Sequence, residues 1–140
     1  MVMEQLAVEI VGLCREYGEC RVEVERMEEA RRVKNALVSV CAMARQRLDI
    51  SDPALLLALL DACEVTRDEG MLQEVLDVVG RNLDRLAVSA ESVKLLACCY
   101  YYVEEEECVE RAGRMLEELR KMGRGEEELA DVETILEELT

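Results

Sequence analysis

Seven cysteines are the residues of this chain with the most obvious chemistry, at positions 14, 20, 41, 63, 98, 99 and 108. Thiolates bind soft metals and act as nucleophiles. No Cys-x-x-Cys pair occurs and the chain has no histidine, so the sequence predicts no zinc or other metal site and no cofactor. Most of these cysteines fall at apolar positions of expected helices, where a free thiol behaves as a small hydrophobic side chain. Their odd number and the absence of a signal peptide favour a reducing compartment.

A catalytic thiol is the second chemical possibility. Cys98 and Cys99 are adjacent, so they point to different faces of a helix and one of them could be exposed. Lys94 lies one turn before Cys98, but acidic residues follow soon after, and an activated thiol needs positive surroundings. Without histidine the usual general base is missing, and no glycine-rich phosphate loop follows a strand. We therefore predict a protein that is not an enzyme and has no catalytic residues.

Aromatic and acidic residues are concentrated at one place, in the run "YYYVEEEE" at 100–107. Tyr100 is in phase with the apolar positions of its expected helix, whereas Tyr101 and Tyr102 are expected on the flank or surface. Tyrosine there can act as an interface hot spot, or it can seal the joint between helix pairs. The predicted partner-binding surface consists of Tyr101, Tyr102, Glu104, Glu105, Glu106 and Glu107.

The charge of the chain is strongly negative, with 32 acidic and 17 basic residues and a net charge of −15. Residues 1–50 carry a net charge of −1, residues 51–100 carry −5, and residues 101–140 carry −9. Such a field repels phosphate backbones and anionic membranes and favours basic partners. No apolar stretch reaches membrane-spanning length, so we expect a soluble intracellular protein of the cytoplasm, with the mitochondrial matrix or the nucleus as alternatives.

The only basic cluster lies in the N-terminal half, between Arg21 and Arg47, and glutamates interrupt it. Glu28 and Arg32 are four residues apart, which is typical of a solvated helix face with salt bridges. The alternative is an RNA-facing surface made of Arg26, Arg31 and Lys34. Tracking of phosphates requires an excess of cations, so direct binding of nucleic acid is not the expectation.

Composition indicates which elements position these residues. The chain has 140 residues, the size of one domain, with one proline, seven glycines and neither Phe nor Trp. Few breaks and an aliphatic core favour helices, so we predict a single all-α domain of about seven helices. Helix pairs are expected at about 3–48, 52–86 and 89–122, and a capping helix at 126–139.

Boundaries within these pairs follow from start and stop signals. Gly18 is a candidate stop for the first helix, and the second is expected from near Val22 to Leu48 with Met27 in its apolar phase. A serine is expected to open the first helix of each later pair, namely Ser51 and Ser89. Asp52 is the alternative cap for the first of these, because it would place Pro53 at the first helical position.

An internal repeat connects the later pairs. "RLDISDPALLLALLDAC" at 47–63 and "RLAVSAESVKLLACCYY" at 85–101 match at a spacing of 38, whereas the helices that follow match better at 36. The repeat is thus expected to slip by two residues at the corner, and the first helix pair is a candidate for a divergent third copy. Repeated antiparallel hairpins predict a short α-solenoid, in which each hairpin buries the next. An irregular helical bundle is the alternative.

Residues 47–122 also resemble a known group of repeats. "LLDACEVTRDEGMLQEVLDVV" and "LLACCYYYVEEEECVERAGRMLEELRKMG" resemble the helical hairpins of pentatricopeptide and tetratricopeptide proteins, and "LDRLAVSAESVKLLACC" is similar to heptatricopeptide and octotricopeptide repeats. The resemblance implies a binding scaffold. Pentatricopeptide and octotricopeptide repeats bind organellar RNA, whereas tetratricopeptide repeats bind peptides or proteins. The missing Trp, the missing closing prolines and the negative C-terminal third depart from these patterns.

The function expected from residues and resemblance together is a protein–protein interaction module. It would be a scaffold or adaptor subunit of a larger complex and would bind a basic or amphipathic helical segment of a protein partner. The alternative is an organellar RNA-binding protein or a subunit of a ribonucleoprotein complex.

Overall fold

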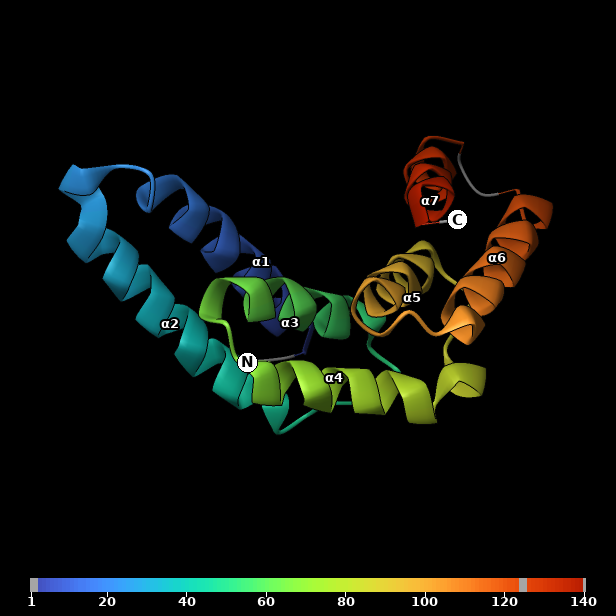
Figure 1. Ribbon diagram of the computed structural model, residues 1–140, viewed down its shortest axis with the longest axis horizontal. Helices are drawn as coiled ribbons and strands as arrows, with labels where there is room; N and C mark the ends of the chain where they lie inside the picture. Colours follow the sequence, from blue (N-terminus) through green and yellow to red (C-terminus); the bar gives the residue numbers. More distant parts are fainter. Residues whose placement is uncertain (1–2, 124–125, 140) are drawn as a thin grey trace. The chain divides into compact units, whose positions relative to one another are not determined.

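The computed structural model describes the backbone of residues 3–123 and 126–139 and the side chains of residues 5–123 and 129–138. Within these ranges the chain forms seven α-helices and two short 3-10 helices, and it contains no strand (Figure 1). The α-helices are α1 Met3–Cys20, α2 Met27–Arg45, α3 Pro53–Thr66, α4 Glu69–Arg81, α5 Ala90–Val103, α6 Glu106–Lys121 and α7 Glu126–Leu139. The predicted all-α fold is confirmed.

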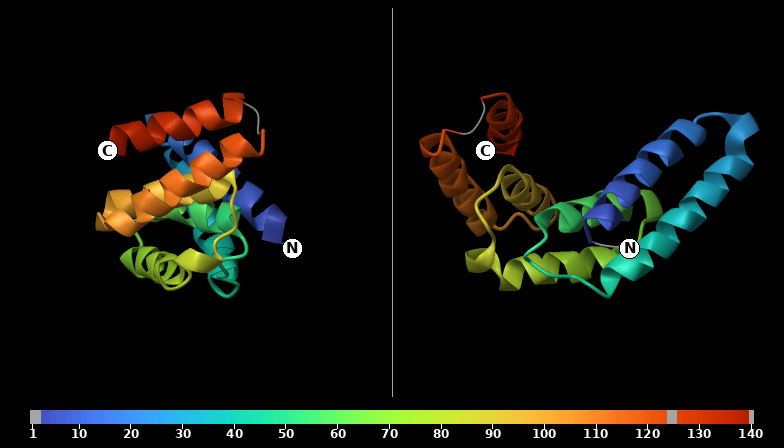
Figure 2. Two further views of the ribbon diagram at one scale, coloured as in Figure 1. Left: turned by 90° about the vertical axis from the view of Figure 1, so that its right-hand side faces the viewer. Right: turned by 180° about the vertical axis from the view of Figure 1, so that it is seen from behind.

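The chain divides into two compact units, Met1–Val75 and Leu76–Thr140, and α4 crosses the boundary. In the first unit α1 packs against α2 and α3, and α2 also contacts α3. In the second unit α5 packs against α6 and α7, and α6 also contacts α7. Each unit therefore contains an antiparallel helix pair whose two members both contact the helix that follows (Figure 2).

The sequence left two candidate residues for the N-cap of helix α3, Ser51 and Asp52. Asp52 is the N-cap, and its Oδ1 accepts a hydrogen bond from the Leu55 backbone N–H at 3.1 Å. Ser51 lies outside the helix and is exposed, so the expectation that it opens α3 is wrong. Asp52 is the cap because Pro53 then occupies the first helical position, where the missing N–H costs no hydrogen bond.

Helix α5 has the predicted serine cap. Ser89 is in an extended conformation, and its Oγ accepts the backbone N–H of Ser92 at 3.1 Å. The Ser92 hydroxyl is fully buried and lies 2.9 Å from the Ser89 Oγ, so this polar group has a hydrogen-bond partner in the core.

Helices α3 and α5 also end in the same way. Arg67 follows α3 with φ of 56°, and Glu104 follows α5 with φ of 52°, both in the left-handed region. The backbone N–H of Arg67 bonds to the carbonyl of Cys63, and that of Glu104 bonds to the carbonyl of Tyr100, each at 2.8 Å. These hydrogen bonds satisfy carbonyls that the ends of helices leave unpaired.

The two corners show the true spacing of the repeat. Pro53 and Ala90 open their helices, Thr66 and Val103 close them, and Glu69 and Glu106 open the helices that follow, always 37 residues apart. The expected slip from 38 to 36 is therefore wrong. It arose from matching serines and apolar letters, whereas the caps and the buried positions keep a single spacing.

Burial repeats at that spacing as well. The positions that are buried in both α3 and α5 are Leu55 and Ser92, Leu56 and Val93, Ala58 and Leu95, Leu59 and Leu96, Leu60 and Ala97, and Ala62 and Cys99. Both helices are thus covered on more than one side. The buried positions of α4 and α6 also match at a spacing of 37, namely Met71 and Cys108, Val75 and Ala112, and Val79 and Leu116. Three buried positions of α2 precede those of α4 by 38 residues instead, namely Val33, Leu37 and Cys41.

Arginines at the ends of α2 and α6 connect these helices to the elements that follow. Arg45 Nη2 lies 2.6 Å from Glu74 Oε1 on α4, and Arg45 Nη1 lies 2.9 Å from Asp68 Oδ2. Arg120 Nε donates to Glu133 Oε1 on α7 at 2.9 Å. Both arginines come directly after the last buried position of their helix, so each side chain reaches across the edge of the packed face.

The first helix pair differs from the expectation at its corner. Helix α1 continues past Gly18 to Cys20, and a 3-10 turn, Val24–Arg26, precedes α2. The second helix is therefore shorter than predicted, and Met27 at its start is 55% exposed instead of buried. The cause is local, because Glu23 adopts an extended conformation that ends the helical path before Val24.

Helices α6 and α7 complete the second unit. Helix α6 is followed by Gly123 with φ of 72°, a conformation that glycine adopts without strain, and the expected end of the third helix pair at about 122 agrees with this. Helix α7, expected as a capping helix at 126–139, buries Leu129, Val132 and Leu136 as a narrow stripe.

Candidate functional site

The corner between α5 and α6 contains the predicted partner-binding residues, all within the second unit. Tyr101 on the last turn of α5 is 68% exposed, and Tyr102 is half-buried. Their rings meet edge to face, with centroids 5.2 Å apart and an interplanar angle of 84°. The neighbouring Val103 is 40% exposed, so two large side chains of this turn face water although the helix is otherwise well buried.

The four glutamates that follow are all exposed. Glu104 adopts the left-handed conformation, Glu105 is the N-cap of α6, and Glu106 and Glu107 lie in its first turn. Carboxylates there are favoured by the partial positive charge of a helix N-terminus. The side chain of Glu105 makes no capping hydrogen bond, so a structural role explains the position of these acids only in part.

We call this group the corner surface and define it as Tyr101, Tyr102, Val103 and Glu104–Glu107. The structure brings together every residue of the predicted surface, and it adds Val103, which the sequence analysis did not include. A signal for Val103 was present, because a residue directly before a left-handed corner is at the open end of its helix. Chemically the surface combines aromatic and aliphatic contact area with a rim of negative charge.

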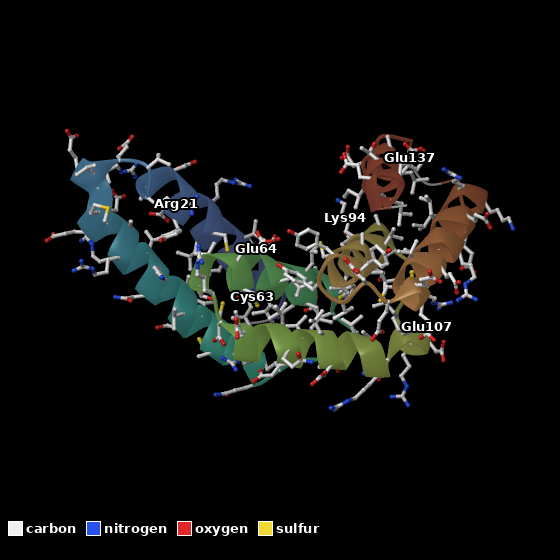
Figure 3. The ribbon with its side chains drawn as sticks, viewed as in Figure 1. Arg21, Cys63, Glu64, Lys94, Glu107 and Glu137 are labelled. Carbon is white, nitrogen blue, oxygen red and sulfur yellow. The ribbon has the colours of Figure 1, made fainter. Side chains whose placement is uncertain are left out.

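The thiol on the exposed side of α5 is Cys98. Cys98 is half-buried. Lys94, which lies one turn earlier and is labelled in Figure 3, is also half-buried. The adjacent Cys99 is buried, and burial raises its pKa to about 12, with the neighbouring thiols Cys108 and Cys98 adding to the effect. A thiol with so high a pKa stays protonated at neutral pH and is a poor nucleophile.

Three thiols lie near one another in the first unit, one each from α1, α2 and α3. Burial raises the pKa of Cys14 and of Cys41 to about 11 and that of Cys63 to about 12. After burial, Asp61 adds to the rise at Cys14, Cys14 to that at Cys41, and Asp68 with the other two thiols to that at Cys63, because a second negative charge would be unfavourable beside the first. In the part of the chain that the structure describes, no group of three or more Cys, Asp or Glu side chains is arranged to hold a metal ion.

The residues of the alternative RNA-facing surface lie near the start of α2 and are not equally available. Arg26 Nε donates to Glu29 Oε2 at 2.9 Å, and Arg26 Nη2 donates to Glu29 Oε1 at 3.1 Å. Glu23 lies 3.7 Å from the same guanidinium group. Arg26 is thus neutralised by two carboxylates, while Arg31 is exposed and Lys34 is half-buried.

Comparison with known proteins adds no relative. No protein-family model, no curated protein sequence and no solved structure matches the chain. The similarity of residues 47–122 to helical-hairpin repeats therefore remains a resemblance. Across the described helices, none has both the length and the hydropathy that crossing a bilayer requires.

Proposed function

We propose that the chain is a protein–protein interaction module that binds a basic or amphipathic helical segment through the corner surface. In this role it is not an enzyme but a scaffold or adaptor subunit of a larger complex. The observation that carries the proposal is the composition of the corner surface. Exposed aromatic and aliphatic side chains lie next to four exposed carboxylates, within one short stretch of one unit.

The physical chemistry of the surface defines the partner. Tyr101 offers a large and rigid contact area with little loss of conformational entropy, which is why tyrosine is common among interface hot spots. Lysine or arginine side chains can interact with both the tyrosine ring face and the acidic rim. Opposite charges at a rim mainly speed the encounter of the two proteins and contribute less to the final affinity.

Helical-repeat architecture is part of the proposal. The 37-residue recurrence of caps, left-handed corners and buried positions supports it. The common packing pattern of the two units supports it too, since in each one the next helix contacts both members of the preceding pair. A short α-solenoid related to the pentatricopeptide and tetratricopeptide group is the arrangement that we propose. The seven free cysteines of the chain favour a reducing intracellular compartment.

The RNA-binding alternative has less support. Its best-placed cation, Arg26, is already paired with Glu29 and Glu23, so it contributes little free charge to a phosphate contact. The remaining cations Arg31 and Lys34 do not form the excess of positive charge that phosphate binding requires. Salt-sensitive binding of single-stranded RNA by the whole chain would nevertheless favour this alternative over ours.

The test measures the association rate of a synthetic helical peptide of leucine and lysine with the whole chain at low salt. Changing Glu104, Glu105, Glu106 and Glu107 together to Gln removes the rim charge while it keeps the size of each side chain. We expect the association rate constant to fall roughly tenfold, because electrostatic steering acts on the encounter. Tyr101→Ala is expected to change mainly the dissociation rate.

A matched control separates the corner from the overall negative field. The control variant changes four other exposed glutamates of the second unit to Gln, namely Glu117, Glu118, Glu137 and Glu138. It alters the net charge equally, so a smaller effect on the association rate is expected. Equal rates for the two variants would assign the attraction to the whole molecule and would overturn the corner surface as the site.

A further inference from the structure

A strip of exposed basic and apolar side chains runs along α2 in the first unit. Met27 is 55% exposed, Arg31 is exposed, Lys34 is half-buried and Val38 is 49% exposed. Steps of three or four residues separate each of them from the next, so the four side chains lie in one row along the helix. We call this row the α2 strip. None of its members is among the buried residues of α2, so packing of the first unit leaves the strip in contact with water.

The charge around the α2 strip is opposite to that of the whole chain. Residues 30–48 contain five arginines and lysines and no Asp or Glu, although the net charge of the chain is −15. The two acids of α2, Glu28 and Glu29, lie in its first turn, at the start of the strip. Among the residues that the structure describes, no ion pair involves Arg31 or Lys34. These two cations are therefore available to carboxylates of another molecule.

The corner surface carries the complementary groups. Its exposed carboxylates, Glu104–Glu107, match the two cations, and its exposed Tyr101 and Val103 match the apolar members of the strip. The α2 strip is also the kind of segment that the proposed function assigns to this surface, because it is helical, exposed, basic and partly apolar. RNA would use mainly the cations, since a phosphate backbone offers no apolar contact to Met27 or Val38. A protein partner therefore uses more of the strip than RNA does.

We propose that the α2 strip of one copy binds the corner surface of a second copy, so that the chain associates with itself head to tail. This proposal rests on the proposed function, because it identifies a partner for the corner surface. The two halves of the contact are different surfaces, and every bound pair therefore keeps one unused strip and one unused corner surface. Both surfaces are small, so we expect weak association, with a dissociation constant on the order of 10–100 µM.

The experiment measures the mass of the whole chain by analytical ultracentrifugation at low salt over a range of concentrations. Variant A changes the strip by Arg31→Gln, Lys34→Gln and Val38→Asn, and variant B changes the corner surface by Tyr101→Ala with Glu104–Glu107 all changed to Gln. We expect the unmodified chain to form dimers and larger species, and association of each variant alone to be weakened roughly tenfold or more. An equimolar mixture should form dimers but no larger species, because B supplies an intact strip and A supplies an intact corner surface.

The matched control for variant A changes two exposed arginines and one exposed apolar residue elsewhere in the first unit, by Arg15→Gln, Arg21→Gln and Met43→Asn. It alters the net charge by the same amount, so it should associate nearly as well as the unmodified chain. Unchanged association of variant A, an equal loss in this control, or an A and B mixture without dimers would each overturn the pairing of strip and corner surface. Thermal melts show whether each variant is folded, and if A is not, Arg31→Gln with Lys34→Gln alone repeats the test.

The leucine–lysine peptide separates this proposal from the proposed function. The peptide should dissociate the dimers, because it occupies the corner surface. If the unmodified chain stays monomeric at every concentration, self-association is overturned, while peptide binding that the corner substitutions weaken keeps the proposed function in place. Failure of the peptide to bind the corner surface overturns the proposed function instead, and the mass of the A and B mixture then decides self-association separately. Salt-sensitive binding of single-stranded RNA that variant A loses would assign the strip to nucleic acid and overturn the proposal.

Discussion

The corner after α3 and the corner after α5 have the same backbone and different chemistry. In both, a 14-residue helix ends at a residue in the left-handed conformation, and the next helix begins two residues later. At the first corner Asp68 accepts the Met71 backbone N–H at 3.0 Å with one oxygen and binds Arg45 with the other. At the second corner the equivalent residue, Glu105, makes no capping hydrogen bond.

This difference separates positions fixed by packing from positions open to binding. At the first corner Asp68 acts within its own unit, because it caps α4 and pairs with Arg45 at the end of α2. At the second corner four carboxylates are exposed to water next to Tyr101, and they contribute little to the stability of the fold. Two copies of one backbone can thus have separate roles, because caps and buried positions define the fold while the exposed corner residues are free to vary.

The largest effect is expected from the buried position that the two copies share. Leu59 and Leu96 are equivalent in the repeat and are both fully buried. Changing either to Ala should lower the free energy of unfolding by about 2–5 kcal/mol, because a cavity remains in the core. Urea denaturation measures both losses, with the half-buried Leu57→Ala as the control for a smaller loss. A much smaller loss for Leu96→Ala than for Leu59→Ala would show that the copies are not equivalent in packing.

A smaller effect is expected from the link that only the first corner has. Arg45→Met removes the partner of Glu74 and Asp68 and keeps the aliphatic stem of the side chain. All three side chains are partly exposed, so solvent screening limits the expected loss to about 1 kcal/mol. Arg31→Met on the exposed face of α2 is the control and should change the free energy of unfolding by much less.

The pH dependence of the same variant gives a second readout. The hydrogen bond from Arg45 lowers the pKa of Glu74 in the folded state, so the pair stabilises the protein above the ordinary glutamate pKa. That contribution disappears as the pH falls through the lowered pKa. The difference in stability between the unmodified chain and Arg45→Met should therefore be present at pH 7 and absent in strong acid. An equal difference at both pH values would show that Arg45 acts through packing alone.

Sequence patterns were sufficient for the fold class but not for the register of the repeat. Apolar periodicity and the scarcity of breakers predicted seven helices, because these signals extend over whole helices. The register failed because it was read from Ser51 and Ser89, which look alike, although Asp52 is the residue that caps α3. A cap depends on one hydrogen bond, so a shift by one residue is hard to see in sequence letters.

The candidate site was predicted in composition and missed in detail for a similar reason. Tyr101 and the glutamates stood out because aromatic and acidic residues are concentrated there. Whether Val103 would be exposed depended on where α5 ends, and Arg26 looked available because its pairing with Glu29 depends on the geometry of the turn before α2. Side-chain pairing and exposure at helix ends are three-dimensional properties that spacing alone does not determine.

The smallest effect is expected from giving the second corner the cap that the first one has. Glu105 has extended backbone angles that suit an N-cap, but its side chain makes no capping bond. Glu105→Asp provides the shorter acid that Asp68 uses at the equivalent position, so it should stabilise the protein by about 0.5–1 kcal/mol in thermal or urea unfolding. Glu106→Asp makes the same change one residue later, outside the cap, and should give no such gain. Equal effects of the two substitutions would mean that the corners differ in more than the length of one side chain, and the close equivalence of their backbones would then be wrong.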